Sequence, residues 1–189
     1  NMELVSIKGL ERYYEMASET VKALDGVDLE ITQGERIILL GPSGSGKTTL
    51  LNCLSALDSP TAGSYSFSGN QVPKDDSEAM TSFRRENIGY VFQFFNLLQD
   101  LTVLENILLI QELSGGRDES RARNLLSLVG LEKETDRFPA EISGGQQQRV
   151  AIARSLAKKP RLLLGDELTG NLDSTTSSSV MEVLVRACE

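Results

Sequence analysis

The sequence of 189 residues has no histidine, no tryptophan, no long apolar run and only two cysteines. Cys53 and Cys188 are far apart and lack the spacing of metal ligands, so we expect no disulfide and a chain suited to a reducing cytosol. No apolar run is long enough to span a bilayer, and no secretory signal is visible at the N-terminus. We therefore expect a cytoplasmic protein.

The chain also has fewer basic than acidic residues: 19 Lys and Arg against 27 Asp and Glu, which gives a net charge of -8. An acidic surface disfavours broad contact with the nucleic-acid backbone, so we expect no nucleic-acid partner. Hydrophobic residues make up 40% of the chain and charged residues 24%, which is ordinary for a soluble domain with a sizeable core.

One stretch organises the chain. Residues 41–48, GPSGSGKT, fit the phosphate-loop pattern G-x-x-x-x-G-K-[ST]. They follow an apolar segment, residues 36–40, that we expect to be a buried strand, and a helix is expected from residue 48 to 54. Glycines let backbone amides point toward a polyphosphate, and the helix N-terminus attracts the same anion. The sequence therefore predicts an ATP and Mg²⁺ site.

Within this loop, Lys47 is expected to contact the β- and γ-phosphates and the Thr48 hydroxyl to ligate Mg²⁺. The other expected contacts to ATP are Gly41, Ser43, Gly44, Ser45, Gly46 and Thr49.

A second pattern carries acidic residues. Residues 161–164 predict a buried parallel strand that leads to Asp166 and Glu167. In a chain with a phosphate loop, this pattern is expected to hold Asp166 near Mg²⁺ and to let Glu167 orient or deprotonate the attacking water. Another apolar strand, residues 88–92, ends at Gln93.

The remaining pattern is mixed α/β. Thr102 and Glu105 form a capping box for a helix that begins at Val103. Residues 143–146, SGGQ, precede a further helix from residue 146 to 158, where the glycines form either an anion-receptive nest or a plain turn. We further expect half-buried antiparallel strands at 4–7 and 27–31 with residues 12–14 in their connection, a strand at 64–67, a short helix within 71–86, and helices at 119–129 and 175–188.

Taken in this order, the motifs resemble the nucleotide-binding subunit of ATP-binding cassette (ABC) transporters over nearly the whole chain. The resemblance implies that Gln93 is the Q-loop glutamine, a catalytic residue and Mg²⁺ ligand, and that Glu167 is the catalytic glutamate. It also implies that Tyr14, in preference to Tyr13, stacks on adenine, although either tyrosine could be a partly exposed strand residue. The resemblance implies that residues 41–48 are the Walker A loop and that residues 162–166 are the Walker B strand. The implied signature residues are Ser143, Gly144, Gly145 and Gln146, and the implied D-loop residue is Asp173.

The fold implied by the resemblance is a P-loop NTPase (RecA-like) α/β core with an antiparallel β subdomain and an inserted α-helical subdomain. The core would comprise residues 1–93 and 146–189, and the helical subdomain residues 94–145. Two such chains would form a head-to-tail homodimer, with each ATP between the Walker A loop of one chain and the signature loop of the other. The amides near Ser143 would then face the γ-phosphate and help to exclude water.

The branch of the family can also be narrowed. Residues 92–98, FQFFNLL, and 101–106, LTVLEN, resemble the lipoprotein-release and macrolide-export branch. This implies a transmembrane permease as partner, with the chain at the inner face of the cell membrane. The apolar cluster Phe94, Phe95, Leu97 and Leu98 would either take a helix of that permease or form the core of the helical subdomain.

Two departures from the family pattern leave alternatives open. Leu168 stands where the family has a proline, and no histidine can act as the switch residue expected about 30 residues after Glu167. Because the sequence ends at Glu189, we expect the C-terminal part of the core to be missing, as in a truncated or incompletely represented chain or a degenerate copy. The rival functions are a soluble ABC ATPase without a permease and a nucleotide-binding module with little turnover.

Overall fold

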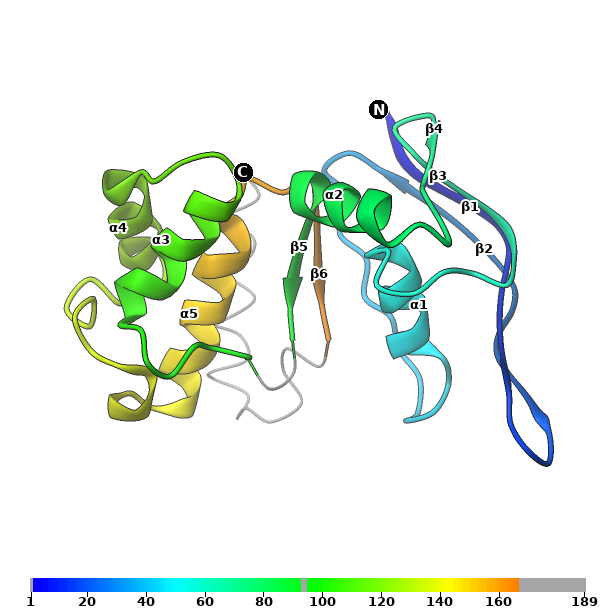
Figure 1. Ribbon diagram of the computed structural model, residues 1–189, viewed down its shortest axis with the longest axis horizontal. Helices are drawn as coiled ribbons and strands as arrows, with labels where there is room; N and C mark the ends of the chain where they lie inside the picture. Colours follow the sequence, from blue (N-terminus) through cyan, green and yellow to red (C-terminus); the bar gives the residue numbers. More distant parts are fainter. Residues whose placement is uncertain (1, 93–94, 167–189) are drawn as a thin grey trace. The chain divides into compact units, whose positions relative to one another are not determined.

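The computed structural model describes residues 2–92 and 95–166. The chain divides into two compact units, an N-terminal unit of residues 1–84 and a C-terminal unit of residues 85–189 (Figure 1). Each unit has its own sheet and its own apolar core, and each is considered separately below.

The N-terminal unit is built on a four-stranded antiparallel sheet in the order β2-β1-β3-β4. Its long hairpin pairs β1 with β2 from Glu3 opposite Thr32 to Glu15 opposite Thr20. Leu4, Val5, Ile7 and Leu10 of β1 and Leu24 and Ile31 of β2 are buried. The pairing confirms the two predicted strands. The strands are β1 (Glu3–Glu15), β2 (Thr20–Thr32), β3 (Ala62–Phe67) and β4 (Asn70–Gln71).

The hairpin is longer than predicted. Residues 12–14 were expected in the connection but lie in β1, where Tyr13 pairs with Lys22 and Tyr14 with Val21. Aromatic and β-branched residues favour a pleated strand, so pairing continues past the point where the polar segment suggested a loop. The connection is short, and the N–H of Met16 donates to the carbonyl of Glu19 across it at 2.8 Å.

Two helices pack in this unit, α1 (Lys47–Leu54) and α2 (Ser77–Asn87). The α1 helix buries Leu50, Leu51, Cys53 and Leu54, and the buried hydroxyl of Tyr65 in β3 donates to the carbonyl of Leu54 at 2.7 Å. Phe83 of α2 meets Phe67 of β3 edge to face, with ring centroids 5.3 Å apart. The sheet therefore holds the helix that follows the phosphate loop in a fixed place.

The expected strand at residues 36–40 is wrong: this segment is irregular, and its side chains are largely exposed. Ile38 is 71% exposed and Leu40 is 90% exposed. An apolar run has the propensity for a strand, but a buried strand also needs neighbours that accept its hydrogen bonds and cover its faces. No described strand pairs with this segment, so propensity alone did not make it a strand.

The C-terminal unit pairs β5 (Ile88–Val91) with β6 (Leu162–Gly165) in parallel, which confirms both predicted strands. Three helices share one apolar core in this unit, and Figure 1 shows them side by side: α3 (Val103–Leu113), α4 (Glu119–Leu128) and α5 (Gly144–Leu156). A Cβ atom at Gly89 would lie 2.7 Å from the carbonyl oxygen of Ser155, so β5 passes α5 too closely for any side chain at that position.

The helix ends follow the predicted capping signals. The Thr102–Glu105 capping box is present in both directions, with hydrogen bonds of 2.7 and 3.2 Å. Gly130, with φ of 76°, follows the C-cap residue of α4, a left-handed position that glycine favours. The α5 helix begins at Gly144, two residues earlier than predicted, after the short 3₁₀ helix η1 (Pro139–Glu141).

No helix within residues 2–92 and 95–166 is both long and apolar enough to cross a membrane. The division into a core of residues 1–93 and 146–189 with a helical subdomain of residues 94–145 stays a prediction. The helix predicted at residues 175–188 lies outside the described residues.

Arg154 of α5 holds the segment that follows β5. Its guanidinium donates to the carbonyl of Asn96 at 2.7 Å and to that of Phe95 at 2.5 Å. Both acceptor residues have left-handed backbones, with φ of 65° at Phe95 and 52° at Asn96, which costs free energy in residues other than glycine. Burial lowers the pKa of Arg154, and the two carbonyls offset part of the cost of burying its charge.

Replacing Arg154 by Met should therefore lower the free energy of unfolding by about 1–3 kcal/mol, because the strained segment loses both donors while the side-chain volume is kept. The control is Arg123→Met, since Arg123 forms an exposed pair with Glu119 on α4 at 2.8 Å. Its loss should stay below about 0.5 kcal/mol. Urea unfolding followed by circular dichroism measures both variants. If both lose the same free energy of unfolding, the hydrogen bonds of Arg154 do not stabilise the segment after β5.

Cys53 provides a second test of the N-terminal core. Its side chain is 1% exposed, and burial raises the pKa of its thiol to about 11. Because the thiolate is the reactive form, a Cys188→Ser variant should react with a thiol reagent at pH 8 only as fast as the α1 region opens. Labelling should become rapid in urea. If Cys53 reacts in the native protein as fast as it does in the unfolded protein, α1 is not packed as described.

Candidate functional site

The phosphate-loop segment turns sharply against β2. Gly44 and Gly46 have left-handed backbones, with φ of 80° and 92°, and the N–H of Ser45 donates to the carbonyl of Pro42 at 3.2 Å. A Cβ atom at Gly46 would lie 2.4 Å from the carbonyl oxygen of Ala23 in β2. Backbone cannot yield as a flexible side chain can, so this position requires glycine for both its conformation and its space.

Lys47 lies over its own loop. Its ammonium donates to the carbonyls of Gly41 and Pro42, the latter at 3.1 Å. A Cβ atom at Gly41 would come within 2.9 Å of the Ser45 hydroxyl and 3.9 Å of the Lys47 ammonium. A side chain at position 41 would therefore displace the flexible Ser45 hydroxyl, while the Lys47 ammonium would be at ordinary contact distance.

The N-terminus of α1 is open to an anion. Gly46 is the N-cap residue, no side chain accepts a hydrogen bond there, and the first turn contains no acidic residue. The backbone N–H groups of a helix start and the helix dipole together favour a phosphate at such an end. Thr48 is exposed in this turn, and Thr49 is half-buried. The loop, the helix end and Lys47 thus converge in one place, as the sequence predicted.

The residues of this turn also suit Mg²⁺ bound through a nucleotide. Within the described ranges, no group of three or more histidine, cysteine, aspartate or glutamate side chains could hold a metal ion by itself. Mg²⁺ in nucleotide sites takes one or two protein oxygens and completes its shell with phosphate and water. The exposed Thr48 hydroxyl is a suitable donor of this kind, so the residues fit the ion.

Tyr14 lies in a network that the sequence did not reveal. Its hydroxyl donates to Asp58 Oδ2 at 2.8 Å, and the Nε of Arg12 donates to the same oxygen at 2.8 Å. The Arg12 guanidinium also lies over the Tyr14 ring, 4.4 Å from its centroid. Asp58 follows α1 in the chain, so the network joins β1 to the loop that leaves the phosphate-loop helix. Had residues 12–14 been predicted as strand, the two-residue spacing would have placed Arg12 and Tyr14 on one face.

Tyr13 points into a different set of contacts. Its hydroxyl donates to Asp25 of β2, and Lys22 of β2 lies 5.2 Å from its ring centroid. These contacts stay within the exposed hairpin, and the hydrogen bond to Asp25 raises the pKa of Tyr13 to about 12. The Tyr14 side chain reaches beyond the hairpin to Asp58, whereas the contact of Tyr13 beyond the hairpin is made by its backbone N–H, which donates to Thr61 Oγ1 at 2.9 Å.

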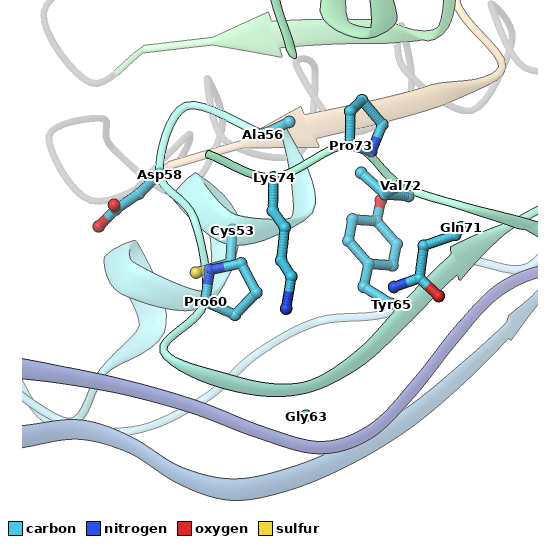
Figure 2. A pocket seen from close by; sticks show the side chains of 10 residues that line it. All are labelled: Cys53, Ala56, Asp58, Pro60, Gly63, Tyr65, Gln71, Val72, Pro73 and Lys74. Atoms are coloured by element: carbon cyan, nitrogen blue, oxygen red, sulfur yellow. The ribbon is translucent and has the colours of Figure 1, made fainter. Parts of the chain in front are cut away.

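Behind this network lies a small hollow of about 10 Å³. Figure 2 shows Cys53, Tyr65 and Lys74 around it, with the Asp58 carboxylate directed away from the other lining side chains. This space suffices for about one water molecule, so the interior here has no room for a nucleotide. A base near Tyr14 would therefore lie on the surface of the unit.

The acidic half of the predicted site begins in the C-terminal unit, at the carboxyl ends of β5 and β6. The N–H of Asp166 donates to the carbonyl of Val91 at 3.1 Å, so pairing continues one residue past β6. Burial, together with the negative charge of Asp166, raises the pKa of the Tyr90 hydroxyl to about 12. Parallel strands end at the same edge, which is where such folds bind ligands.

The signature residues lie at the start of α5. The Ser143 hydroxyl accepts from the N–H of Gln146 at 3.2 Å, and the Gln146 side chain accepts from the N–H of Ser143 at 2.9 Å. Gly144 and Gly145 form the first turn of the helix and are not in a loop before it. Their amides, at a helix N-terminus without acidic residues, remain suited to an anion. Gln93, Glu167 and Asp173 lie outside the described residues.

Comparison with known proteins matches residues 24–170 to a protein family described as ABC transporter. The chain is 42% identical over 187 residues to the lipoprotein-releasing system ATP-binding protein LolD of Chromohalobacter salexigens, covering 97% of this chain and 79% of that protein. It is 42% identical over 193 residues to the macrolide export ATP-binding/permease protein MacB of Syntrophobacter fumaroxidans, covering all of this chain and 27% of that protein.

A solved structure is similar to nearly the whole chain. The ATP-binding cassette MJ0796, determined as a dimer in a post-hydrolysis state bound to ADP and Pi, matches with a TM-score of 0.89 and 40% sequence identity. The match covers 98% of this chain and 83% of that one. Since the family match includes both the phosphate loop and the signature residues, this chain belongs to the ABC transporter family.

Proposed function

We propose that this chain binds ATP with Mg²⁺ and hydrolyses ATP to drive a membrane export permease of the lipoprotein-release or macrolide-efflux type. The observation that carries the proposal is the phosphate loop, where left-handed glycines, an uncapped helix N-terminus and Lys47 meet. The similarity to LolD and MacB, at 42% identity, supports the export branch.

Binding of ATP would use three kinds of contact. The loop amides and the positive end of α1 would bind the phosphates, with Lys47 moving from its own loop carbonyls to phosphate oxygens. Thr48, Gln93 and Asp166 would hold Mg²⁺, which neutralises charge on the phosphates when bound. Tyr14 would stack on the base, since its contacts reach Asp58 after α1.

In hydrolysis, Glu167 would orient the attacking water and accept its proton. Gln93 and Asp166 follow the parallel strands β5 and β6 in sequence, so both would be fixed by the ends of that sheet. A chain with these groups still needs donors on the far side of the γ-phosphate, and the Ser143–Gln146 helix end of a second chain would supply them.

Pairing of two chains is therefore part of the proposal. The capping box uses the Ser143 hydroxyl and leaves the Gly144 and Gly145 amides to face a phosphate. The dimeric cassette MJ0796 bound to ADP and Pi supports such a pairing here. Asp173, in the D-loop, would lie at the same head-to-tail interface.

The permease would dock near the segment after β5, which would hold the chain at the inner face of the membrane. Phe94 lies outside the described residues, Phe95 is half-buried and Leu97 is buried, but Leu98 is 48% exposed. The cluster is thus partly core and partly surface, and the exposed part would contact a helix of the permease. No observation favours the soluble ATPase or the non-catalytic module over this function.

Lys47→Ala should abolish measurable ATP binding, because the loop would lose its point charge for the β- and γ-phosphates. The control is Lys8→Ala, which removes an exposed lysine of β1 and leaves the loop intact. Isothermal titration calorimetry with ATP and Mg²⁺ measures both variants. Unchanged affinity in Lys47→Ala would show that the phosphates bind elsewhere.

Glu167→Gln should keep ATP binding and lower the rate of phosphate release by at least about 10²-fold, since the amide cannot accept the proton of water. Light scattering should then show more paired chains with ATP than without it, because the trapped nucleotide joins the two subunits. Glu132→Gln, at an exposed position, controls for the change in charge and should leave both readouts unaltered. If Glu167→Gln releases phosphate as fast as the wild-type chain, Glu167 is not the catalytic base.

A further inference from the structure

The network around Tyr14 bears on how the base of ATP is recognised, and this inference rests on the proposed stacking of that base on Tyr14. We propose that Arg12 and Asp58 are positioning residues that lock the Tyr14 ring as a platform for the base. They would thereby set how much the base, as distinct from the phosphates, contributes to affinity.

Three contacts fix the ring. The hydroxyl of Tyr14 donates to Asp58 at 2.8 Å, Arg12 donates to the same carboxylate oxygen at 2.8 Å, and the guanidinium covers one ring face at 4.4 Å. A tyrosine ring held at its hydroxyl and over one face has lost most of its freedom to turn. A base that stacks on it would then lose little conformational entropy on binding, which is the advantage of a preorganised site.

The arrangement leaves one face for a ligand. Arg12 occupies the first face, and among residues 2–92 and 95–166 no second aromatic ring or cationic side chain lies over the other. The hollow behind Asp58 is about 10 Å³, so a base does not fit there. The base would then stack on the face of Tyr14 opposite Arg12.

The network is partly shielded from water, which makes it more than a pair of surface charges. Arg12 and Asp58 have side chains that are each 25% exposed. Burial opposes the charge on Asp58, but the hydrogen bonds from Arg12 and Tyr14 outweigh it and lower the pKa of the carboxyl. Burial, followed by the bond to Asp58, raises the pKa of Tyr14, so the hydroxyl stays a donor at neutral pH.

The same segments place the phosphate loop. The Ala23 carbonyl of β2 limits position 46, and Arg12 pairs with Leu24, the next residue of that strand. Asp58 leaves the other end of α1, where its N–H donates to the carbonyl of Asn52 at 3.2 Å. The β1–β2 hairpin and α1 therefore hold both the phosphate loop and the Tyr14 ring. If the ring is fixed, its distance from phosphates bound at the loop is fixed as well.

The chain contains its own control. Tyr13, Asp25 and Lys22 likewise combine a tyrosine, an aspartate and a basic residue, with lysine in place of arginine. The Tyr13 hydroxyl donates to Asp25, and Lys22 lies near the ring. The side-chain contacts of this set stay within the hairpin, and the link from Tyr13 to the loop after α1 is made by its backbone N–H, which donates to Thr61 Oγ1 at 2.9 Å and which side-chain substitutions leave in place. These side chains should not affect nucleotide binding.

The experiment compares ATP with inorganic tripolyphosphate, both with Mg²⁺, by calorimetry on the full chain. Tripolyphosphate has the phosphates but no base, so it reports the loop alone. Tyr14→Leu should weaken ATP binding about tenfold, and Arg12→Met and Asp58→Asn about three- to tenfold, with tripolyphosphate affinity unchanged in all three. Tyr13→Leu, Lys22→Met and Asp25→Asn should leave both ligands unaffected.

A double variant separates positioning from charge. In the Tyr14→Leu background, Arg12→Met should cause no further loss of ATP affinity, because no ring remains to be positioned. The proposal is overturned if Arg12→Met weakens tripolyphosphate binding as much as ATP binding, since Arg12 would then act on the phosphates or on folding. It is also overturned if ATP affinity is unchanged in Arg12→Met and Asp58→Asn, or if the Tyr13 set has the same effects.

The outcomes also distinguish this inference from the proposed function. If the wild-type chain binds neither ATP nor tripolyphosphate, the proposed function itself fails. If it binds both with equal affinity and Tyr14→Leu changes nothing, ATP binding through the phosphate loop stands and the locked base platform is wrong.

Discussion

The candidate site depends on one close approach, between Gly46 and the carbonyl of Ala23. A side chain at position 46 would lie 2.4 Å from that oxygen, and the left-handed φ of 92° would strain it as well. With glycine there, the loop can turn against β2 and begin α1 without a side-chain cap. The helix N-terminus that favours an anion is a direct consequence of this turn.

The α1 helix connects that turn to the rest of the N-terminal unit. Its buried face, with Cys53 and Leu54, fixes the helix on the sheet, and Tyr65 binds its last carbonyl. The chain that leaves α1 then brings Asp58 to Arg12 and Tyr14. A single short helix thus connects the groups proposed for the phosphates with those proposed for the base, and the role proposed for Asp58, a carboxylate outside every motif, rests on this connection.

In the C-terminal unit, α5 has a comparable role. Its first turn carries the signature glycines, its middle supplies Val150 and Ile152 to the core, and Arg154 near its end clamps the strained segment after β5. A shift of this helix would move all three at once, because a close-packed core does not deform freely. The position of the signature amides is therefore set by apolar packing.

The sequence by itself determined the presence of the hairpin, the Thr102 helix cap, the glycine-rich loop and the family, because each depends on local patterns such as alternation, capping boxes and glycine spacing. It did not determine the length of the hairpin. Tertiary structure decided what those patterns could not show. The apolar run at 36–40 is exposed because burial requires partner strands, and Asp58 joins Tyr14 although 44 positions separate them. Contacts between residues so far apart depend on how the elements pack, and packing follows from the whole core and not from any local pattern.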